Sequence, residues 1–322
     1  MDTLERLTVT VLAEDSVGYE TPYLGQHGVS FYLQGEAAGA RAPGAEAAGT
    51  PAPGAAGAGA PGADEAARAE PGSARNILVD VAQHPDPLLF NMDRMGIDPA
   101  SIDAIVLTHC HYDHTQGLAR VVKEIGKADL PIVAHPDIFR TTFITAPYLR
   151  HVGVPASDSR EKVEAAGGRF FLSSAPLGLM PGLTTSGEID RTTDYEAVEM
   201  GLGTIRNDRL QVDDVRDDIS VFAMTEKSGA VVVTGCSHAG IVNICRAGKA
   251  LTGARGVGVV IGGLHLIEAS TERITRTAAD LKAEGVERIA AGHCTGFPAQ
   301  GELQSVFGDR FSPLRTGDVF EL

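Results

Sequence analysis

The sequence lacks the hydrophobic segments that insertion into a membrane requires. None of its apolar runs approaches the roughly 20 residues that a membrane-spanning helix needs. Its first residues, Met1 to Arg6, carry neither the basic nor the apolar segment of a signal peptide. We therefore expect a cytoplasmic protein that does not act at a membrane.

Cysteine is also scarce, which excludes a fold held together by disulfides. The chain contains only four cysteines, and each of them stands singly. Small secreted proteins use paired cysteines to compensate for a small core, whereas a hydrophobic content of 43% supplies a sizeable core here. Reduced thiols agree with a cytoplasmic location.

Positive charge is in short supply, with 27 Lys and Arg residues against 42 Asp and Glu residues and a net charge of −15. Proteins that bind nucleic acid do so mainly through basic surfaces, so we expect no nucleic-acid partner. A small anionic substrate remains compatible with this balance, because bound metal ions supply local positive charge that the net charge ignores.

Large apolar side chains are nearly absent from residues 36 to 75, where Ala, Gly and Pro dominate. Such a composition cannot offset the entropy cost of ordering, so we predict a disordered insertion at 36–75. Residues 31–33 and 76–79 resemble strands, which would place the insertion in a hairpin loop. We interpret it as a tolerated insertion rather than a functional tether, within a single domain that spans residues 1–322.

The most informative segment that is present reads T-H-C-H-Y-D-H-T-Q-G at residues 108 to 117. His109, His111, Asp113 and His114 offer four metal-binding side chains within six positions, directly after an apolar stretch at 102–107 that resembles a buried strand. Imidazoles beside a carboxylate suit zinc, manganese or iron. A polar strand end whose histidines bond only to backbone is the alternative, and the density of ligand types favours metal.

Further histidines follow other apolar strands, each time after glycine. Glycine lets the backbone turn sharply or pass close to a ligand, so the histidine after it can project from the sheet edge. One such histidine would be ambiguous, but three favour a site shared with the first cluster. The predicted strands at 230–234, 257–261 and 288–291 lead to His238, His265 and His293, respectively.

These motifs resemble those of the metallo-β-lactamase-fold hydrolases, whose signature H-x-H-x-D-H stands at residues 109 to 114. The closer resemblance is to the branch named for 7,8-dihydropterin-6-ylmethyl-4-(β-D-ribofuranosyl)aminobenzene 5'-phosphate synthase. It rests on G-C-S-H-A-G-I at 235–241, G-G-L-H-L at 262–266 and G-H-C-T-G at 292–296. The resemblance implies an α/β fold of the four-layer αββα type, in which two mixed sheets pack face to face and helices cover the outside.

The resemblance also implies a centre for two divalent metal ions, with zinc expected first and manganese or iron as alternatives. His238 is the expected third ligand of the first ion, and Asp218 and Cys236 are the alternatives for that place. The expected ligands are His109, His111 and His238 for the first ion, and Asp113, His114 and His293 for the second.

Other residues near these motifs are expected to support the ligands or to bind substrate. Asp80, and Cys236 if it is not a ligand, would orient metal ligands from behind. The candidate substrate-binding residues are His27, Arg191 and His265.

The chemistry that this centre predicts is hydrolysis by a metal-activated water of a small phosphoester, lactone or related ester. Asp113 and His238 are the candidate catalytic residues, with Asp113 serving as both ligand and proton acceptor. Two alternatives stay open. One is a synthase that condenses a dihydropterin with an aminobenzene ribotide, and the other is a di-iron redox or sensor protein.

Overall fold

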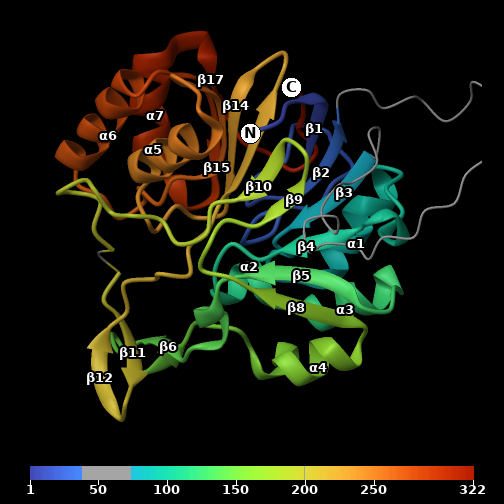
Figure 1. The fold of residues 1–322 in the computed structure, drawn as a ribbon. Helices are drawn as coiled ribbons and strands as arrows, with labels where there is room; N and C mark the ends of the chain where they lie inside the picture. The colour runs from blue at the N-terminus through green and yellow to red at the C-terminus, as the bar shows by residue number, and fades with distance from the viewer. Residues whose placement is uncertain (38–73, 199) are drawn as a thin grey trace, which may run out of the picture.

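Strands form the interior of the molecule and divide into two halves (Figure 1). The computed structural model describes residues 1–37, 74–198 and 200–322. The amino-terminal half contains β1 (Leu4–Ala13), β2 (Ser30–Ala37), β3 (Ala74–Val79), β4 (Ala104–Val106), β5 (Leu130–Ala134) and β8 (Gly168–Leu172). The carboxyl-terminal half contains β13 (Val221–Thr225), β14 (Gly229–Thr234), β15 (Val257–Gly263), β16 (Val286–Gly292) and β17 (Phe311–Pro313). Three short strands pair beside them: β9 (Gly178–Met180), β10 (Leu183–Thr185) and β18 (Val319–Glu321).

Helices cover the outer face of each half (Figure 1). The amino-terminal half is covered by α1 (Pro85–Arg94), α3 (Leu118–Ile125) and α4 (Arg160–Ala165). The carboxyl-terminal half is covered by α5 (Ile241–Thr252), α6 (Thr271–Ala283) and α7 (Phe297–Phe307). Short helical turns complete the connections: α2 (Tyr112–Thr115), η1 (Pro99–Ser101), η2 (Pro136–Phe139), η3 (Ala156–Asp158), η4 (His293–Thr295) and η5 (Gly308–Arg310). Among the described residues, no helix has the length and apolar character that crossing a membrane requires.

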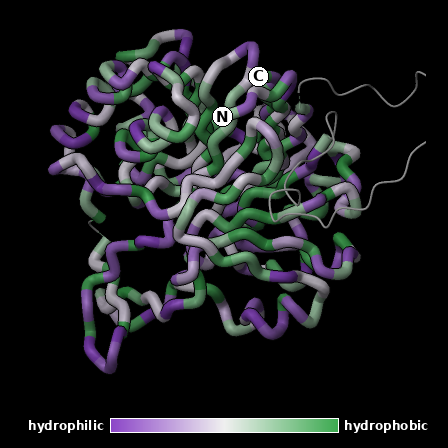
Figure 2. The backbone as a smooth tube through the Cα atoms, viewed as in Figure 1, coloured by the Kyte–Doolittle hydropathy of each residue, from purple (hydrophilic) through white to green (hydrophobic). Residues whose placement is uncertain are grey.

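Successive side chains of the strands point into different cores, and this alternation explains the layers of the fold. In β14, Val231 and Val233 belong to the core between the two halves, whereas Val232 belongs to the core beneath α5, α6 and α7. In β2, Phe31 faces the central core and Tyr32 faces the core beneath the other helices. Successive side chains of a strand point to opposite faces, so strands that are apolar throughout can be covered on both faces. Figure 2 accordingly shows hydrophobic strands in the interior, and the predicted four-layer αββα fold is confirmed.

The two halves are joined more closely than the prediction of two separate sheets implies. β1 pairs with β2 in antiparallel fashion and also with β13 in parallel, where Leu4 stands opposite Thr225. Within the described chain this makes one 14-stranded hydrogen-bonded sheet, with the main order β17-β16-β15-β14-β13-β1-β2-β3-β4-β5-β8. The join is possible because β1 is ten residues long and can pair along both of its edges.

The predicted hairpin around the Ala/Gly/Pro-rich segment is present, but its strands are longer than expected. β2 and β3 pair in antiparallel fashion from Phe31 opposite Val79 to Glu36 opposite Ala74. The prediction of disorder over 36–75 is therefore wrong at both ends, because backbone hydrogen bonds extend the ladder regardless of composition. Residues 38–73 of that prediction lie outside the described residues.

A separate four-stranded sheet lies beside the main body and protrudes from it (Figure 1). Its order is β12-β11-β6-β7, and every residue of β12 is exposed. Residues of β6 and β7 and their neighbours help to line the cavity described below. The strands of this sheet are β6 (Thr142–Ile144), β7 (Arg150–His151), β11 (Leu202–Arg206) and β12 (Arg209–Val212).

Candidate metal centre

The Gly-His segments meet because they follow neighbouring parallel strands. β14, β15 and β16 are parallel, with Thr234 opposite Gly262 and Gly263 opposite Gly292. The carboxyl ends of parallel strands lie at the same edge of a sheet, so the segments that carry His238, His265 and His293 leave the sheet together. The H-x-H-x-D-H segment reaches the same place from the end of β4 through α2.

Three histidines form the first donor group. One side-chain nitrogen each of His109, His111 and His238 lies within 4.8 Å of the others. Nε2 of His109 is 3.1 Å from Nδ1 of His111, and the ring of His238 is centred 4.7 Å from the ring of His109. All three side chains are buried. The structure thus brings together the three residues predicted for the first ion.

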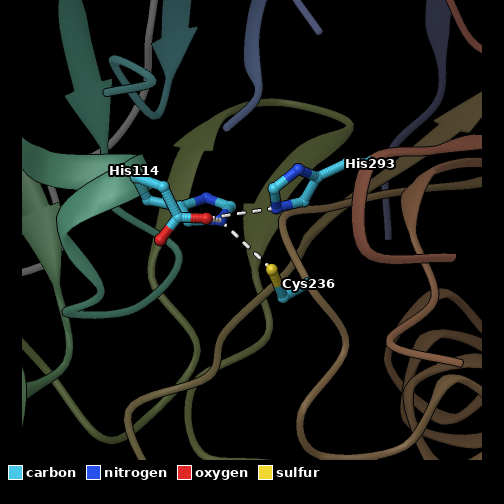
Figure 3. A group of neighbouring side chains, drawn as sticks. His114, Cys236 and His293 are labelled. Atoms are coloured by element: carbon cyan, nitrogen blue, oxygen red, sulfur yellow. Dashed lines mark hydrogen bonds and ion pairs between the residues drawn. The ribbon is translucent and has the colours of Figure 1, made fainter. Parts of the chain in front are cut away.

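The second donor group combines a carboxylate, two imidazoles and a thiol (Figure 3). Oδ2 of Asp113 is 3.5 Å from Nε2 of His114 and 3.2 Å from Nε2 of His293. Sγ of Cys236 is 3.1 Å from the same His114 nitrogen. Cys236 therefore belongs with the donors predicted for the second ion. It is neither a third member of the first group nor a residue behind the ligands.

Two carboxylates, the buried Asp80 and the exposed Asp15, orient two of these histidines. Oδ2 of Asp80 is 2.7 Å from Nδ1 of His114, as expected for a residue that orients a ligand from behind. On the other side, Oδ2 of Asp15 is 2.7 Å from Nδ1 of His293. In both cases the Nε2 atom is left to face the donor group. Asp15 was not predicted, since nothing in its local sequence marks it.

The donor set fits metal ions on the chemistry of its unsatisfied atoms. Nε2 of His111 and both ring nitrogens of His238 are buried and have no hydrogen-bond partner among the described residues. A buried polar atom without a partner costs about 1–3 kcal/mol, so native proteins rarely leave several of them together. A cation would satisfy Nε2 of His111 and one ring nitrogen of His238. The mixture of imidazole, carboxylate and thiolate donors is typical of zinc.

Burial keeps the first group neutral. It lowers the pKa of His111 to about 3, and it lowers the pKa values of His109 and His238 well below the ordinary range. Neutral imidazole is the form that coordinates a metal, so these residues need not lose a proton on binding.

The second group is charged. Burial alone would lower the pKa of His114, but Asp113 and Asp80 outweigh it and raise that pKa to about 9. Burial would raise the pKa of Asp113, but His114 and His293 hold it well below its usual range. In the absence of metal, protons on the imidazoles therefore take the place of the cation beside the carboxylate.

The alternatives considered for the first ion occupy other places. Oδ2 of Asp218 accepts a hydrogen bond from the backbone N–H of Ala239, and Asp218 is in neither donor group. His265 lies next to His238, with ring centroids 4.2 Å apart, and near the thiols of Cys236 and Cys294.

Of the residues predicted to bind substrate, His27 lines the cavity and Arg191 does not. His27 lies at the cavity, with Nε2 3.5 Å from Oδ2 of Asp113 and Nδ1 3.0 Å from Oδ1 of Asp15. Arg191 instead donates to the backbone carbonyls of Asp214 and Val215 and does not line the cavity. The structure thus gives Arg191 a local role away from the donor groups.

A cavity of about 370 Å³ opens onto both groups. Its floor includes His111, Asp113, Cys236, His238 and His293. The rest of the lining comes from Asp15, His27, Tyr112, Ile144, Ala146, Arg150, Val152, Met200, His265, Ile267, Glu268 and Cys294.

Known proteins resemble this chain over most of its length. The profile of the metallo-β-lactamase superfamily matches residues 69–203. The chain is 37% identical to 7,8-dihydropterin-6-methyl-4-(β-D-ribofuranosyl)-aminobenzene-5'-phosphate synthase of Methanocaldococcus jannaschii, over 99% of this chain and 97% of that protein. An uncharacterized protein of the same organism is 29% identical over 72% of this chain and 84% of its own length. A crystal structure of a metal-dependent hydrolase of the β-lactamase superfamily superposes with a TM-score of 0.72 at 21% identity, covering 98% of this chain and 99% of its own, which shows a shared fold.

Proposed function

Because this chain belongs to the metallo-β-lactamase superfamily and is similar to a synthase along nearly its whole length, we propose that it is a metal-dependent synthase. The reaction would join the 6-methyl carbon of a 7,8-dihydropterin to the amine of a 4-(β-D-ribofuranosyl)aminobenzene 5'-phosphate. The observation that carries this proposal is the 37% identity over 99% of the chain, together with two groups of possible metal donors at one cavity.

The proposed step balances as a substitution. A C–N bond forms between the arylamine nitrogen and the pterin methyl carbon, while the bond from that carbon to its anionic leaving group breaks. The leaving group departs with the bonding electron pair, and the amine loses one proton to a base. The step needs no oxidant or reductant.

Different residues at the cavity can stabilise the leaving group and accept the amine proton. The metal ions, held by His109, His111 and His238 and by Asp113, His114, Cys236 and His293, would supply the positive charge that stabilises the departing anion. His27 lines the cavity with Nδ1 3.0 Å from Asp15 and Nε2 3.5 Å from Oδ2 of Asp113, so its imidazole is placed to accept the amine proton.

Hydrolysis is the second candidate function, because the same donor groups would suit metal ions that activate a water molecule. His27 or Asp113 would then accept the proton of that water. The two functions differ in the nucleophile: an arylamine for the synthase and water for the hydrolase.

The experiment that separates them supplies the metal-loaded protein with a 6-(hydroxymethyl)-7,8-dihydropterin activated as its phosphate or diphosphate ester. Mass spectrometry would follow both the coupled product and the released phosphate or diphosphate, with and without the ribotide. Coupled product that forms only with the ribotide, and that is lost in a His238→Ala variant, would support the synthase. Release of phosphate or diphosphate at the same rate without the ribotide, with no coupled product, would overturn it in favour of hydrolysis.

A further inference from the structure

The cavity contains one positively charged side chain, Arg150, that is not among the possible metal donors. Arg150 lines the cavity from β7 and is its only Lys or Arg among the residues that the structure describes. The metal donors come from the edge of the main sheet, whereas Arg150 comes from the separate four-stranded sheet. A cationic side chain therefore reaches the metal cavity from a second structural element.

Arg150 also differs from other arginines of this region in having no partner. Arg140 pairs with Asp213 and Asp217, and Arg206 pairs with Asp137. No ion pair or hydrogen bond to the Arg150 side chain occurs within residues 1–37, 74–198 and 200–322. Its exposed guanidinium therefore keeps its N–H donors free for a ligand.

Apolar side chains line the same cavity. Ile144, Val152, Met200 and Ile267 contribute to its wall. A flat aromatic ring is the kind of group that such a wall accepts, while charged groups need the metal ions or Arg150. With metal ions bound, the cavity would thus offer positive charge at two places together with an apolar surface.

We propose that Arg150 binds the 5'-phosphate of the aminobenzene ribotide. This inference rests on the proposed synthase function, in which two anionic groups must be held at once. The leaving group of the pterin belongs at the metal ions, because charge develops there as the bond breaks. The ribose phosphate takes no part in the reaction and needs a separate cation, and an unpaired guanidinium can bind phosphate through two parallel hydrogen bonds.

The acidic surroundings strengthen the requirement for this arginine. Asp15, Asp113 and Glu268 also line the cavity, and a phosphate would be repelled by them where no cation intervenes. Asp113 belongs to the second donor group, and the carboxylate of Asp15 is hydrogen-bonded to His27 and His293. No ion pair joins Glu268 to Arg150 among the described residues, so the guanidinium is not neutralised by it.

The test compares 4-(β-D-ribofuranosyl)aminobenzene 5'-phosphate with the same compound lacking its phosphate. Binding of each to the zinc-loaded protein would be measured by isothermal titration calorimetry, and coupling rates would be measured where product forms. Variants would be Arg150→Ala, Arg150→Lys and the matched control Arg209→Ala. The control removes the same charge from β12 of the same sheet, at a position that does not line the cavity.

We expect Arg150→Ala to weaken binding of the phosphorylated compound about tenfold or more and to leave binding of the unphosphorylated compound unchanged. Arg150→Lys should recover part of the loss, and Arg209→Ala should bind as the wild type does. In the coupling assay the change should appear in KM for the ribotide, with kcat nearly unchanged.

The proposed function and this inference fail in different ways. The phosphate site alone would be overturned by two results together. The wild type would form the coupled product, and the Arg150→Ala variant would bind both compounds as tightly as the wild type does. Binding of the ribotide that depends on Arg150, in a protein that forms no coupled product, would support the phosphate site and overturn the synthase. A wild type that binds neither compound would overturn both.

Discussion

The carboxylate of Asp80 lies 2.7 Å from Nδ1 of His114, and both side chains are fully buried. The same carboxylate accepts hydrogen bonds from the backbone N–H and the hydroxyl of Thr108, at 2.7 and 2.6 Å. Asp80 thus ties the end of β3 to the residue that precedes the H-x-H-x-D-H segment. It fixes which nitrogen of His114 faces the second donor group.

Replacing Asp80 by Asn should therefore loosen the second donor group without removing a donor. The amide keeps the volume but loses the charge that holds His114 in place, and such changes typically reduce metal affinity about 10–100-fold. Metal content after dialysis against a weak chelator would check this. Asp158→Asn is a matched control, because Asp158 is a buried acid that accepts hydrogen bonds from the backbone N–H groups of Gly117 and Ala119 and belongs to neither donor group. Equal metal content in D80N and the wild type would contradict the role given to Asp80.

Gly235 leaves room for this arrangement, and its substitution by Ala should disturb it. A Cβ atom at Gly235 would lie 2.2 Å from the hydroxyl oxygen of Thr108 and 2.9 Å from Oδ2 of Asp80. We expect a loss of about 1–3 kcal/mol in the free energy of unfolding, the usual cost of overpacking, together with weaker metal retention. Thermal unfolding and metal analysis of the same sample would measure both. Gly301→Ala is the control, since no atom of the described residues lies within 4 Å of a Cβ there and alanine favours its helix. A G235A variant as stable as G301A would refute the prediction.

The layered fold could be predicted because the motifs resemble those of a known family, and most of the residues in the two donor groups could be predicted because they stand in local patterns. Apolar strands that end in glycine and histidine show where side chains leave a sheet, and parallel neighbours bring those ends together. Asp15 could not be found in this way, because it meets His293 only through the tertiary fold, across 278 positions of sequence.

The sequence also could not predict which donor side chains lie next to one another. Cys236 joins the second donor group while His238, two positions later, joins the first, because Ser237 between them has a left-handed backbone with φ of 64°. The small sheet that carries Arg150 was missed as well. Its strands β6 and β7 are only three and two residues long, too short to show a period.

The two donor groups should be separable by mutation. His238 contributes only to the first group, and neither of its ring nitrogens has a hydrogen bond within the described part of the chain, so His238→Ala should remove one metal ion and leave the second in place. Elemental mass spectrometry of protein purified without added metal should then give about two ions for the wild type and about one for the variant, as expected for a two-metal centre. His151→Ala, an exposed histidine on β7, serves as the control. A variant that keeps both ions, or a wild type that binds none when metal is supplied, would contradict the assignment of the first group.

Metal binding should release protons, because the second group holds them when metal is absent. The raised pKa of His114, about 9, means that its imidazole is protonated at neutral pH, and burial keeps the Cys236 thiol protonated by raising its pKa well above the ordinary range. Both groups must lose a proton to coordinate a metal, so apparent metal affinity should increase as pH rises from about 7 to 9. Calorimetric titration of the metal in two buffers with different enthalpies of ionisation would count the released protons, and Cys236→Ser should lower the count by about one.

The same pKa shift predicts how the stability of the metal-free protein changes with pH. The folded-state pKa of His114 lies above its unfolded value of about 6.5, so its contribution to stability is complete below about pH 6.5 and is lost as pH rises through about 9. The metal-free protein should therefore become less stable across this interval, whereas the metal-loaded protein should not, because the metal replaces the proton beside Asp113. Chemical denaturation of both forms at pH 6.5 and 9 would compare them. Parallel losses of stability in the two forms would show that the proton on His114 does not occupy the place of the metal.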